Sequence, residues 1–459
     1  MSARTDTIFA LATPPGRSAI AVIRISGEQA HQAAPAFGAA IPAAGRFGLA
    51  RLRDQAGQQL DEALLLAMKG PDSSTGEDVL EIHCHGSTAV VTTVLQQLAT
   101  FDGFRAAEAG EFTHRMFANG RIDLLGVEAL ADLIDAETDL QRRQAWAQMD
   151  GALRNPTSQW RDMLLVLAAH LETLIDFADE DLPPELAADL RQKAESLTAE
   201  MQNVLDDGRF GEQVRNGVTV ALIGPVNVGK STLLNHLAGR DAAIVSDIAG
   251  TTRDIVSVTI DLDGIPVTLL DTAGIRYTSD MIEAEGVKRA EQAAQEADAV
   301  LIVVDGARSG WHQDITRLTP FVRGKGQVVI TKADLGIVDH DLVDDLAGGA
   351  LVVSLTGPWE QTGPREQRAG NVIIDALRNL VIPANNAEQA SIISRLRHRQ
   401  AIEAALEAVT AAMAHDLDSA PELAAEDLRH AADSLGKIIG LIDVEDLLDS
   451  IFSSFCIGK

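Results

Sequence analysis

The chain has 459 residues, of which 38 are Lys or Arg and 67 are Asp or Glu, so its formal net charge is -29. At roughly 150 residues per domain this length predicts about three domains, and so acidic a surface argues against nucleic-acid binding by the chain unaided. Its two cysteines, Cys84 and Cys456, exclude a disulfide framework, and no apolar run reaches the roughly 18 residues of a membrane span. Strand-like sequence begins directly after the first ten residues and leaves no room for a targeting peptide, so we expect a cytoplasmic protein without membrane contact.

Residues 1–120 have the pattern of a mixed α/β domain. A strand is predicted at 19–26, where alternation places Arg24 among the apolar residues of one face. An arginine there either reaches toward solvent or lines an anion pocket, and the first is favoured.

A second strand, 79–86, places Glu81, His83 and His85 on one side. These are zinc-ligand residue types, but no fourth ligand is near in the sequence. Alternation on a solvated sheet face explains the three side chains without a metal and is favoured.

Apolar residues recur at helical spacing over 124–207 and again in the acidic tail of the chain. Asn155-Pro156 and Leu182-Pro183-Pro184 are expected to break the first run into separate helices. Because helical sequence flanks the segment between, we predict a helical bundle domain with another domain inserted into it. The predicted domains are 1–120, then 121–215 joined with 381–459, and the insert 216–380.

Strands and helices alternate within 216–380, which predicts a doubly wound, mostly parallel sheet. The polar stretch 358–370, rich in Gly, Pro and Gln, is predicted to be a loop. The apolar runs that predict strands are 218–223, 267–270, 299–304, 328–330 and 351–353.

The first of these strands leads into Gly224-Pro225-Val226-Asn227-Val228-Gly229-Lys230-Ser231, the G-x-x-x-x-G-K-[ST] phosphate loop. Its two glycines let the backbone turn N–H groups toward an anion at the start of the following helix. Lys230 would reach the outer phosphates and Ser231 would bind magnesium. A chance Gly-Lys turn is the alternative, but strand, loop and helix follow in the order that the motif requires.

Three further segments at strand ends predict that the nucleotide is GTP. Asp271-Thr272-Ala273-Gly274 offers a carboxylate for the magnesium shell and an N–H for the γ-phosphate. In Thr331-Lys332-Ala333-Asp334, the last residue can accept hydrogen bonds from guanine N1 and N2, a donor pair that adenine lacks. Ser354-Leu355-Thr356 can donate a backbone N–H to the guanine oxygen. Each segment is weak alone, but four in this order predict a GTP-hydrolysing domain.

The residue after Gly274 bears on how GTP is cleaved. Ras-like GTPases carry a water-orienting glutamine there, whereas this chain has Ile275, which cannot orient water. Arg253 and Arg276 are candidate arginine fingers. A fixed cation with Asn227 as an oxygen ligand would do the same electrostatic work.

Several motifs resemble a known family. Residues 246–254, Ser-Asp-Ile-Ala-Gly-Thr-Thr-Arg-Asp, resemble the switch I of TrmE-Era-type GTPases. Four more segments resemble the MnmE (TrmE) family of tRNA modification GTPases, and the likeness covers essentially the whole chain. These segments are Thr13-Pro14-Pro15-Gly16-Arg17, Ile23-Arg24-Ile25-Ser26-Gly27, Ala109-Gly110-Glu111-Phe112-Thr113 and Phe455-Cys456-Ile457-Gly458-Lys459.

The resemblance implies an N-terminal domain that dimerises and binds 5-formyl- or 5,10-methylene-tetrahydrofolate. The implied folate contacts are Arg24, Glu81, Arg121 and Lys459. Arg24 and Glu81 thereby become candidate ligand residues, and the zinc interpretation weakens. The family often has lysine where Arg121 stands, so the charge is kept but the geometry differs.

The resemblance also implies a potassium-dependent G domain in which Glu283 activates water, the role that Ile275 cannot fill. By itself, Glu283 would be interpreted as a solvated residue at a helix start. The implied potassium ligands are Asn227, Ser246, Ile248 (through its backbone) and Thr251, and the implied magnesium ligands are Ser231 and Thr252. The predicted GTP contacts are Asn227, Val228, Gly229, Lys230, Ser231, Thr232, Ser246, Asp247, Ile248, Ala249, Gly250, Thr251, Thr252, Asp271, Thr272, Ala273, Gly274, Thr331, Lys332, Asp334 and Ser354.

Cys456 matches the family's tail cysteine, which is implied to act in the modification chemistry; an inert thiol is the alternative. Three departures from the family pattern concern the nucleotide. Pro225-Val226-Asn227 replaces the more usual order, in which proline directly precedes asparagine. Thr331 replaces the first asparagine of Asn-Lys-x-Asp, which removes an amide that steadies the base and the phosphate loop. Leu355 stands where a small residue is typical.

The function that the resemblance implies is GTP hydrolysis coupled to modification of the wobble uridine of certain tRNAs. A carboxymethylaminomethyl or aminomethyl group would be placed on C5, with the FAD-dependent partner MnmG (GidA) in a heterotetramer or larger complex. Tetrahydrofolate would supply the one-carbon unit, the homodimer's paired G domains would gate conformational steps, and the partner would hold most of the tRNA. The alternatives are a regulatory GTPase of ribosome assembly, which would carry a basic RNA-binding module, and a non-catalytic folate-binding scaffold.

Overall fold

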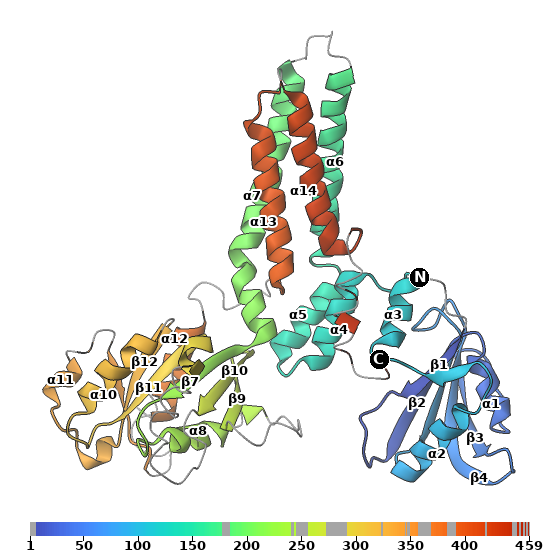
Figure 1. Cartoon of the computed structure of the whole chain (residues 1–459), viewed down its shortest axis with the longest axis horizontal. Helices are drawn as coiled ribbons and strands as arrows, with labels where there is room; N and C mark the ends of the chain where they lie inside the picture. The colour runs from blue at the N-terminus through green and yellow to red at the C-terminus, as the bar shows by residue number, and fades with distance from the viewer. Residues whose placement is uncertain are drawn as a thin grey trace. The chain divides into compact units, whose positions relative to one another are not determined.

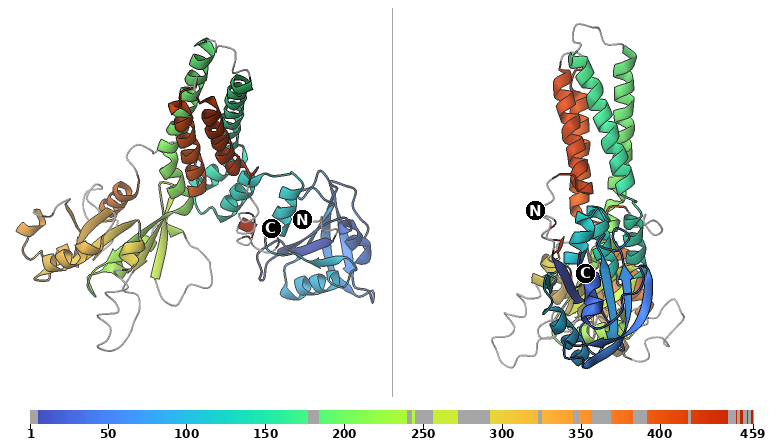
Figure 2. Two further views of the ribbon diagram at one scale, coloured as in Figure 1. Left: turned by 45° about the horizontal axis from the view of Figure 1, so that its top comes forward. Right: turned by 90° about the vertical axis from the view of Figure 1, so that its right-hand side faces the viewer.

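The computed structural model describes residues 6–176, 184–239, 243–244, 256–271, 292–322, 325–344, 346, 349–356, 369–382, 392–417, 420–442, 448, 451–452, 455 and 458 (Figures 1 and 2). The chain forms two compact units. One comprises Met1–Ala131, Arg154–Asp181 and Ala414–Lys459, and the other comprises Asp132–Leu153 and Leu182–Met413.

The first unit begins with a six-stranded sheet of order β3-β4-β5-β2-β1-β6. Its neighbouring strands are antiparallel except for β1 and β6, which run parallel. The strands are β1 (Thr7–Leu11), β2 (Ile20–Ser26), β3 (Arg46–Arg53), β4 (Gln59–Met68), β5 (Val79–His85) and β6 (Phe104–Ala106). The mixed α/β domain that the sequence predicts is confirmed.

One face of this sheet is covered by α1 (Ala33–Ala36) and α2 (Thr88–Leu98), as Figure 1 shows. The alternation predicted for β2 holds, because Ala21, Ile23 and Ile25 are buried beneath those helices. The residues of the opposite face include two large apolar side chains on β3, Phe47 at 71% and Leu49 at 72% exposure. We call this opposite side the open sheet face; it is formed by Ile20, Val22, Arg24, Phe47, Leu49, Leu64, Leu66, Glu81 and His83.

The helices of the first unit tie its C-terminal segment to the N-terminal domain. α6 (Arg154–Asp176) and α14 (Pro421–Ile439) run side by side (Figures 1 and 2). Further along, the ring of Phe452 lies 5.1 Å from that of His114 in α3 (Glu111–Ala118). Leu448, Phe452 and Phe455 share a small core with α4 (Leu124–Asp135).

The second unit is built on a seven-stranded sheet of order β13-β12-β11-β7-β10-β9-β8. Five strands from β13 to β10 are parallel, and β9 runs antiparallel to both of its neighbours. The strands are β7 (Val218–Ile223), β8 (Ala243–Ile244), β9 (Val256–Leu262), β10 (Ile265–Asp271), β11 (Ala299–Asp305), β12 (Lys325–Thr331) and β13 (Ala350–Val352). The predicted doubly wound, mostly parallel sheet is confirmed.

Cores lie on both faces of this sheet, because consecutive residues of the buried strands point to opposite sides. One core joins Val220 and Leu222 to α8 (Lys230–Ala238) and α12 (Ala369–Val381). The other joins Ala221 and Ile223 to α10 (Trp311–Leu318), whose Trp311 is fully buried. The short α11 (Asp341–Asp344) packs against the second core through Leu342 and Val343.

The same unit contains α5 (Asp139–Met149), α7 (Pro184–Asn216) and α13 (Leu396–Ala414). Three glutamines of α5 hold the segments that lead into and out of the sheet domain. Gln141 donates to Arg215 O at 3.1 Å and Gln144 donates to Gly211 O at 3.1 Å, while Gln148 donates to Ile392 O.

Three details differ from the sequence-based expectation. Pro156 lies inside the first turn of α6, where an N–H has no helical partner to lose, so the break comes earlier, between α5 and α6. Gly370 belongs to α12 rather than to a loop, and 358–368 lies outside the described residues. The hairpin of β9 and β10 was not anticipated, although Asp263-Gly264, with φ of 54° and 91°, is the sequence sign of such a turn. None of the helices in the described residues has the length and apolar content that a membrane crossing requires.

Candidate functional site

The loop between β7 and α8 has the geometry that the phosphate-loop motif predicts. Gly224 has φ of 156°, and a Cβ there would lie 2.0 Å from Val303 O, so only glycine lets the chain pass β11. Gly229, with φ of 103°, caps the N-terminus of α8. The first N–H groups of α8, which have no partner within the helix, are therefore available to an anion.

Lys230 lies within this loop with 3% of its surface exposed. Its Nζ donates hydrogen bonds to Gly224 O and Pro225 O, both at 2.7 Å. Burial lowers the pKa of Lys230, and the nearby carboxylate of Asp271 acts in the opposite direction. Phosphate oxygens that replaced these two carbonyl oxygens as hydrogen-bond acceptors would keep the Lys230 ammonium charged.

The structure brings Ser231 and Asp271 together, although they lie 40 residues apart in the sequence. The hydroxyl of Ser231, in the first turn of α8, donates to Asp271 Oδ2 at 2.6 Å, and Asp271 ends β10 with 2% exposure. A hydroxyl and a carboxylate beside a phosphate loop form an oxygen donor set of the kind that magnesium prefers. The predicted Mg²⁺ ligand Ser231 therefore fits that ion.

The residues predicted to contact guanine follow β12 and β13 at the same edge of the sheet. Asp334 accepts a hydrogen bond from Ser354 Oγ at 2.7 Å, and this bond lowers the pKa of its exposed carboxyl. Lys332 pairs with Asp305 at the end of β11, with Nζ and Oδ2 2.6 Å apart. Asp305 was not predicted as part of this site, although an acidic residue at the end of an apolar strand is a sequence signal for one.

Thr331 keeps part of what the missing asparagine was expected to supply. It is fully buried, and its Oγ1 lies 2.5 Å from Val228 O in the phosphate loop and 3.0 Å from Val304 O. A hydroxyl has one proton, so it can donate to one of these carbonyls at a time. The link between this motif and the phosphate loop is therefore present in spite of the substitution.

In the N-terminal domain, the register of β2 and β5 pairs Arg24 with Glu81. Arg24 Nε donates to Glu81 Oε1 at 2.9 Å, and the second carboxylate oxygen lies 3.2 Å from His83 Nε2. The guanidinium carbon of Arg24 lies 5.9 Å from the ring centre of Phe112 in α3. His83 and Phe112 were not predicted as part of this site, but period-two alternation on β5 places His83 beside Glu81.

The C-terminal tail approaches this domain at the end of β1. A Cβ on Gly458 would lie 2.1 Å from Leu11 O, so the tail backbone is in contact with the strand next to β2. Arg121 lies beside the loop that precedes β5, with its Cγ 3.3 Å from the Cβ position of Gly76. The structure does not show a direct contact of Arg121 with Arg24 or Glu81.

Many predicted residues lie outside the described part of the chain. They are Cys456, Lys459, Glu283, Ser246, Asp247, Ile248, Ala249, Gly250, Thr251, Thr252, Arg253, Thr272, Ala273, Gly274, Ile275 and Arg276. Among the residues that are described, no three His, Cys, Asp or Glu side chains are clustered so that they could hold a metal ion. Burial raises the pKa of the Cys84 thiol to about 11, so this cysteine is a core residue rather than a nucleophile.

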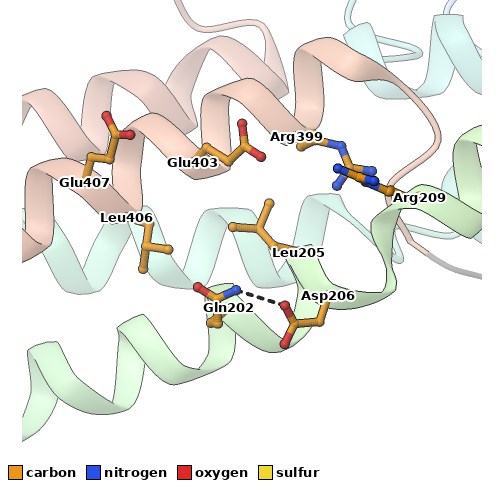
Figure 3. Close-up of a pocket in the computed structure, with 8 residues that line it drawn as sticks. All are labelled: Gln202, Leu205, Asp206, Arg209, Arg399, Glu403, Leu406 and Glu407. Carbon is orange, nitrogen blue, oxygen red and sulfur yellow. Dashed lines mark hydrogen bonds between the residues drawn. The ribbon is translucent and has the colours of Figure 1, made fainter. Parts of the chain in front are cut away.

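A cavity of about 400 Å³ lies between α7 and α13 (Figure 3). It contains none of the residues predicted from the sequence. Three carboxylates and two guanidinium groups line it, so opposite charges offset one another and no ligand class stands out. The lining residues are Gln202, Leu205, Asp206, Arg209, Arg399, Glu403, Leu406 and Glu407.

This chain is similar to known proteins over essentially its whole length. Residues 7–121 match the family described as GTP-binding protein TrmE N-terminus, and residues 124–456 match the MnmE helical domain. The tRNA modification GTPases MnmE of Caulobacter vibrioides and Parvibaculum lavamentivorans are each 45% identical to this chain, over 99% of it and 100% of their own length. A crystal structure of Aquifex aeolicus Era bound to GDP.AlF4- is 25% identical over 42% of this chain and 66% of that one, with a TM-score of 0.28. Because full-length relatives are 45% identical and both family models match, this chain belongs to the MnmE family of tRNA modification GTPases.

Proposed function

We propose that this protein hydrolyses GTP at the carboxyl edge of its seven-stranded sheet, as one step in modifying the wobble uridine of certain tRNAs in the cytoplasm. The observation that carries the hydrolytic part is the 2.6 Å hydrogen bond between Ser231 and Asp271, next to the buried ammonium of Lys230. This arrangement combines a cation for phosphate oxygens with two oxygen donors for magnesium.

The residues divide the work as follows. Lys230 gives up its two carbonyl partners for phosphate oxygens and offsets their charge. Ser231 and Asp271 hold magnesium, with Thr252 as a further ligand, and the ion supplies additional charge compensation when bound. Asp334 selects guanine, because its carboxylate accepts hydrogen bonds from both N1 and N2 of the base.

We infer that potassium replaces an arginine finger. Ile275 cannot orient water, so the proposal assigns water activation to Glu283 and potassium binding to Asn227, Ser246, Ile248 and Thr251. Asn227 supports it, since this residue of the phosphate loop is exposed, has φ of 62° and carries a side-chain oxygen that can bind a cation.

We further propose that the N-terminal domain binds 5-formyl- or 5,10-methylene-tetrahydrofolate through Arg24, Glu81, Arg121 and Lys459. The Arg24–Glu81 pair supports this, because an ion pair whose two side chains remain partly exposed can exchange partners with a polar ligand. The contact of Gly458 with Leu11 supports a role for the tail. Cys456 would act there in the modification chemistry.

The open sheet face also supports a homodimer. Phe47 and Leu49 expose two large apolar side chains on an edge strand, which a second copy of the domain would cover. We propose that two copies work with the FAD-dependent MnmG (GidA) in a heterotetramer or larger complex, and that MnmG holds the tRNA, because a chain of charge -29 repels it. In this proposal 216–380 is a G domain inserted between the helical segments 121–215 and 381–459, and 1–120 is the folate domain.

The test replaces the chromosomal gene by Ser231→Ala and measures wobble-uridine nucleosides in total tRNA together with GTP turnover of the purified protein. We expect turnover to fall at least about 100-fold, on the scale of losing one transition-state charge contact, and the C5 modification to disappear. A regulatory GTPase of ribosome assembly would instead leave the nucleosides intact and change the ratio of ribosomal subunits. Folate binding is scored separately, by titrating 5-formyl-tetrahydrofolate into wild-type protein and Arg24→Ala.

A further inference from the structure

We propose that His236 is a positioning residue for guanine recognition, an inference that rests on the guanine-nucleotide binding proposed above. His236 lies in the last turn of α8, the helix that begins at the phosphate loop. Its Nε2 lies 2.9 Å from Leu355 O, in the segment that follows β13. Because a carbonyl can only accept, Nε2 carries the proton and donates it.

Leu355 belongs to residues 354–356, which we call the base-reading segment. This segment positions Asp334, the residue proposed to accept hydrogen bonds from guanine. Ser354, adjacent to Leu355, donates to Asp334 Oδ1 at 2.7 Å and lies 3.0 Å from Thr356 Oγ1. A shift of Leu355 O therefore moves the hydroxyl that orients Asp334.

The side chain of Leu355 packs the same segment against Gly229 of the phosphate loop. It is 8% exposed, and its Cδ1 lies 3.2 Å from the position of a Cβ on Gly229. Leu355 is one of the departures from the family pattern, and a smaller residue would not fill this space. The large side chain of Leu355 thus holds the base-reading segment against the phosphate loop by packing. The hydrogen bond from His236 holds the same segment to α8.

The substitution at Thr331 explains why this chain needs a second link between these two segments. Thr331 retains the bond to Val228 O but lacks the amide with which asparagine would also steady the base. The bond from His236 to Leu355 restores a second link between the phosphate-binding and base-reading segments. With both links present, Asp334 keeps its place relative to a nucleotide whose phosphates are fixed at α8.

The test compares the binding of GDP and of inosine diphosphate to wild-type protein and three full-length variants. Inosine lacks the 2-amino group and so lacks one of the donors that Asp334 accepts from. The variants are His236→Ala, which removes the donor, His236→Gln, which restores an N–H donor of similar reach, and Asn235→Ala, an exposed neighbour on the same helix.

We expect His236→Ala to bind GDP about three- to tenfold more weakly, the loss of one hydrogen bond, while binding of inosine diphosphate changes less. Turnover at saturating GTP should stay unchanged, His236→Gln should restore GDP affinity, and Asn235→Ala should match wild type in all respects. Equal losses for both nucleotides, or no loss for GDP, would overturn the inference. If wild-type protein bound no GDP at all, the proposed function itself would fail, which the titration of wild type reports separately.

Discussion

Removing the Thr331 hydroxyl tests whether one buried hydrogen bond holds the phosphate loop in place. Thr331→Val keeps the shape of the side chain but takes away the donor that lies 2.5 Å from Val228 O. Thr331 is 0% and Val228 is 2% exposed, so water cannot replace the lost partner without opening the loop. A buried acceptor left unpaired costs about 1–3 kcal/mol, which corresponds to a roughly five- to 150-fold weaker Kd if the loop must reorder on binding.

The assay is equilibrium titration of a fluorescent GDP analogue, with thermal unfolding of the same samples as a check on folding. Thr331→Ser is the matched control, since it keeps the hydroxyl and loses only a methyl group 3.8 Å from the Cβ position of Gly229. Thr331→Asn, which restores the family's usual residue, should bind GDP at least as tightly as wild type. If Thr331→Val bound GDP within twofold of wild type, the idea that this hydroxyl holds the loop would be refuted.

Three further outcomes follow from the structure and the proposal. GTP turnover should rise steeply when potassium replaces sodium, and Asn227→Ala should abolish the difference; equal rates of wild type in both salts would remove the fixed-cation mechanism. Thr138→Val should remove both the bond that Thr138 Oγ1 donates to Gly264 O at 2.6 Å and the side-chain cap of α5, lowering the free energy of unfolding by about 1 kcal/mol and raising hydrogen exchange in the β9–β10 hairpin. Burial opposes ionisation of Glu111, but hydrogen bonds from Arg105, Arg115 and the backbone N–H of Glu108 together outweigh it and lower the pKa of this carboxyl. These interactions stabilise the fold above pH about 4.5, and the stabilisation is lost as the pH falls through the lower folded-state pKa. The stability deficit of Glu111→Gln, from denaturant unfolding at several pH values, should therefore shrink in acid.

Local sequence was sufficient where the physical cause is itself local. The phosphate loop needs two glycines, a lysine and a hydroxyl at fixed spacing, and the structure places Lys230 and Ser231 as that spacing predicts. The alternation of β2 and β5 likewise predicted the side on which Arg24 and Glu81 lie. The hairpin turn at Asp263-Gly264 belongs to the same class, and its signal was present but not used.

Contacts between distant segments could not be obtained in this way. Nothing near Thr331 in the chain indicates that its hydroxyl meets Val228, 103 residues away, because a strand's neighbours depend on how the whole sheet is ordered. The same holds for His236, which reads in the sequence as an ordinary helix residue and becomes significant only because β13 ends beside α8. Only the tertiary structure therefore shows that Thr331 still links this motif to the phosphate loop.

The amino-acid sequence by itself thus determined which chemical groups the protein owns and the order in which its strands, loops and helices present them, since hydrogen-bonding patterns and side-chain periodicity act over a few residues. Tertiary structure decided which of those groups meet. It paired Ser231 with Asp271, fastened the base-reading segment to α8 and brought Gly458 against β1. The reason is that long-range contacts form only when burial of several apolar surfaces at once repays the entropy of ordering the chain between them.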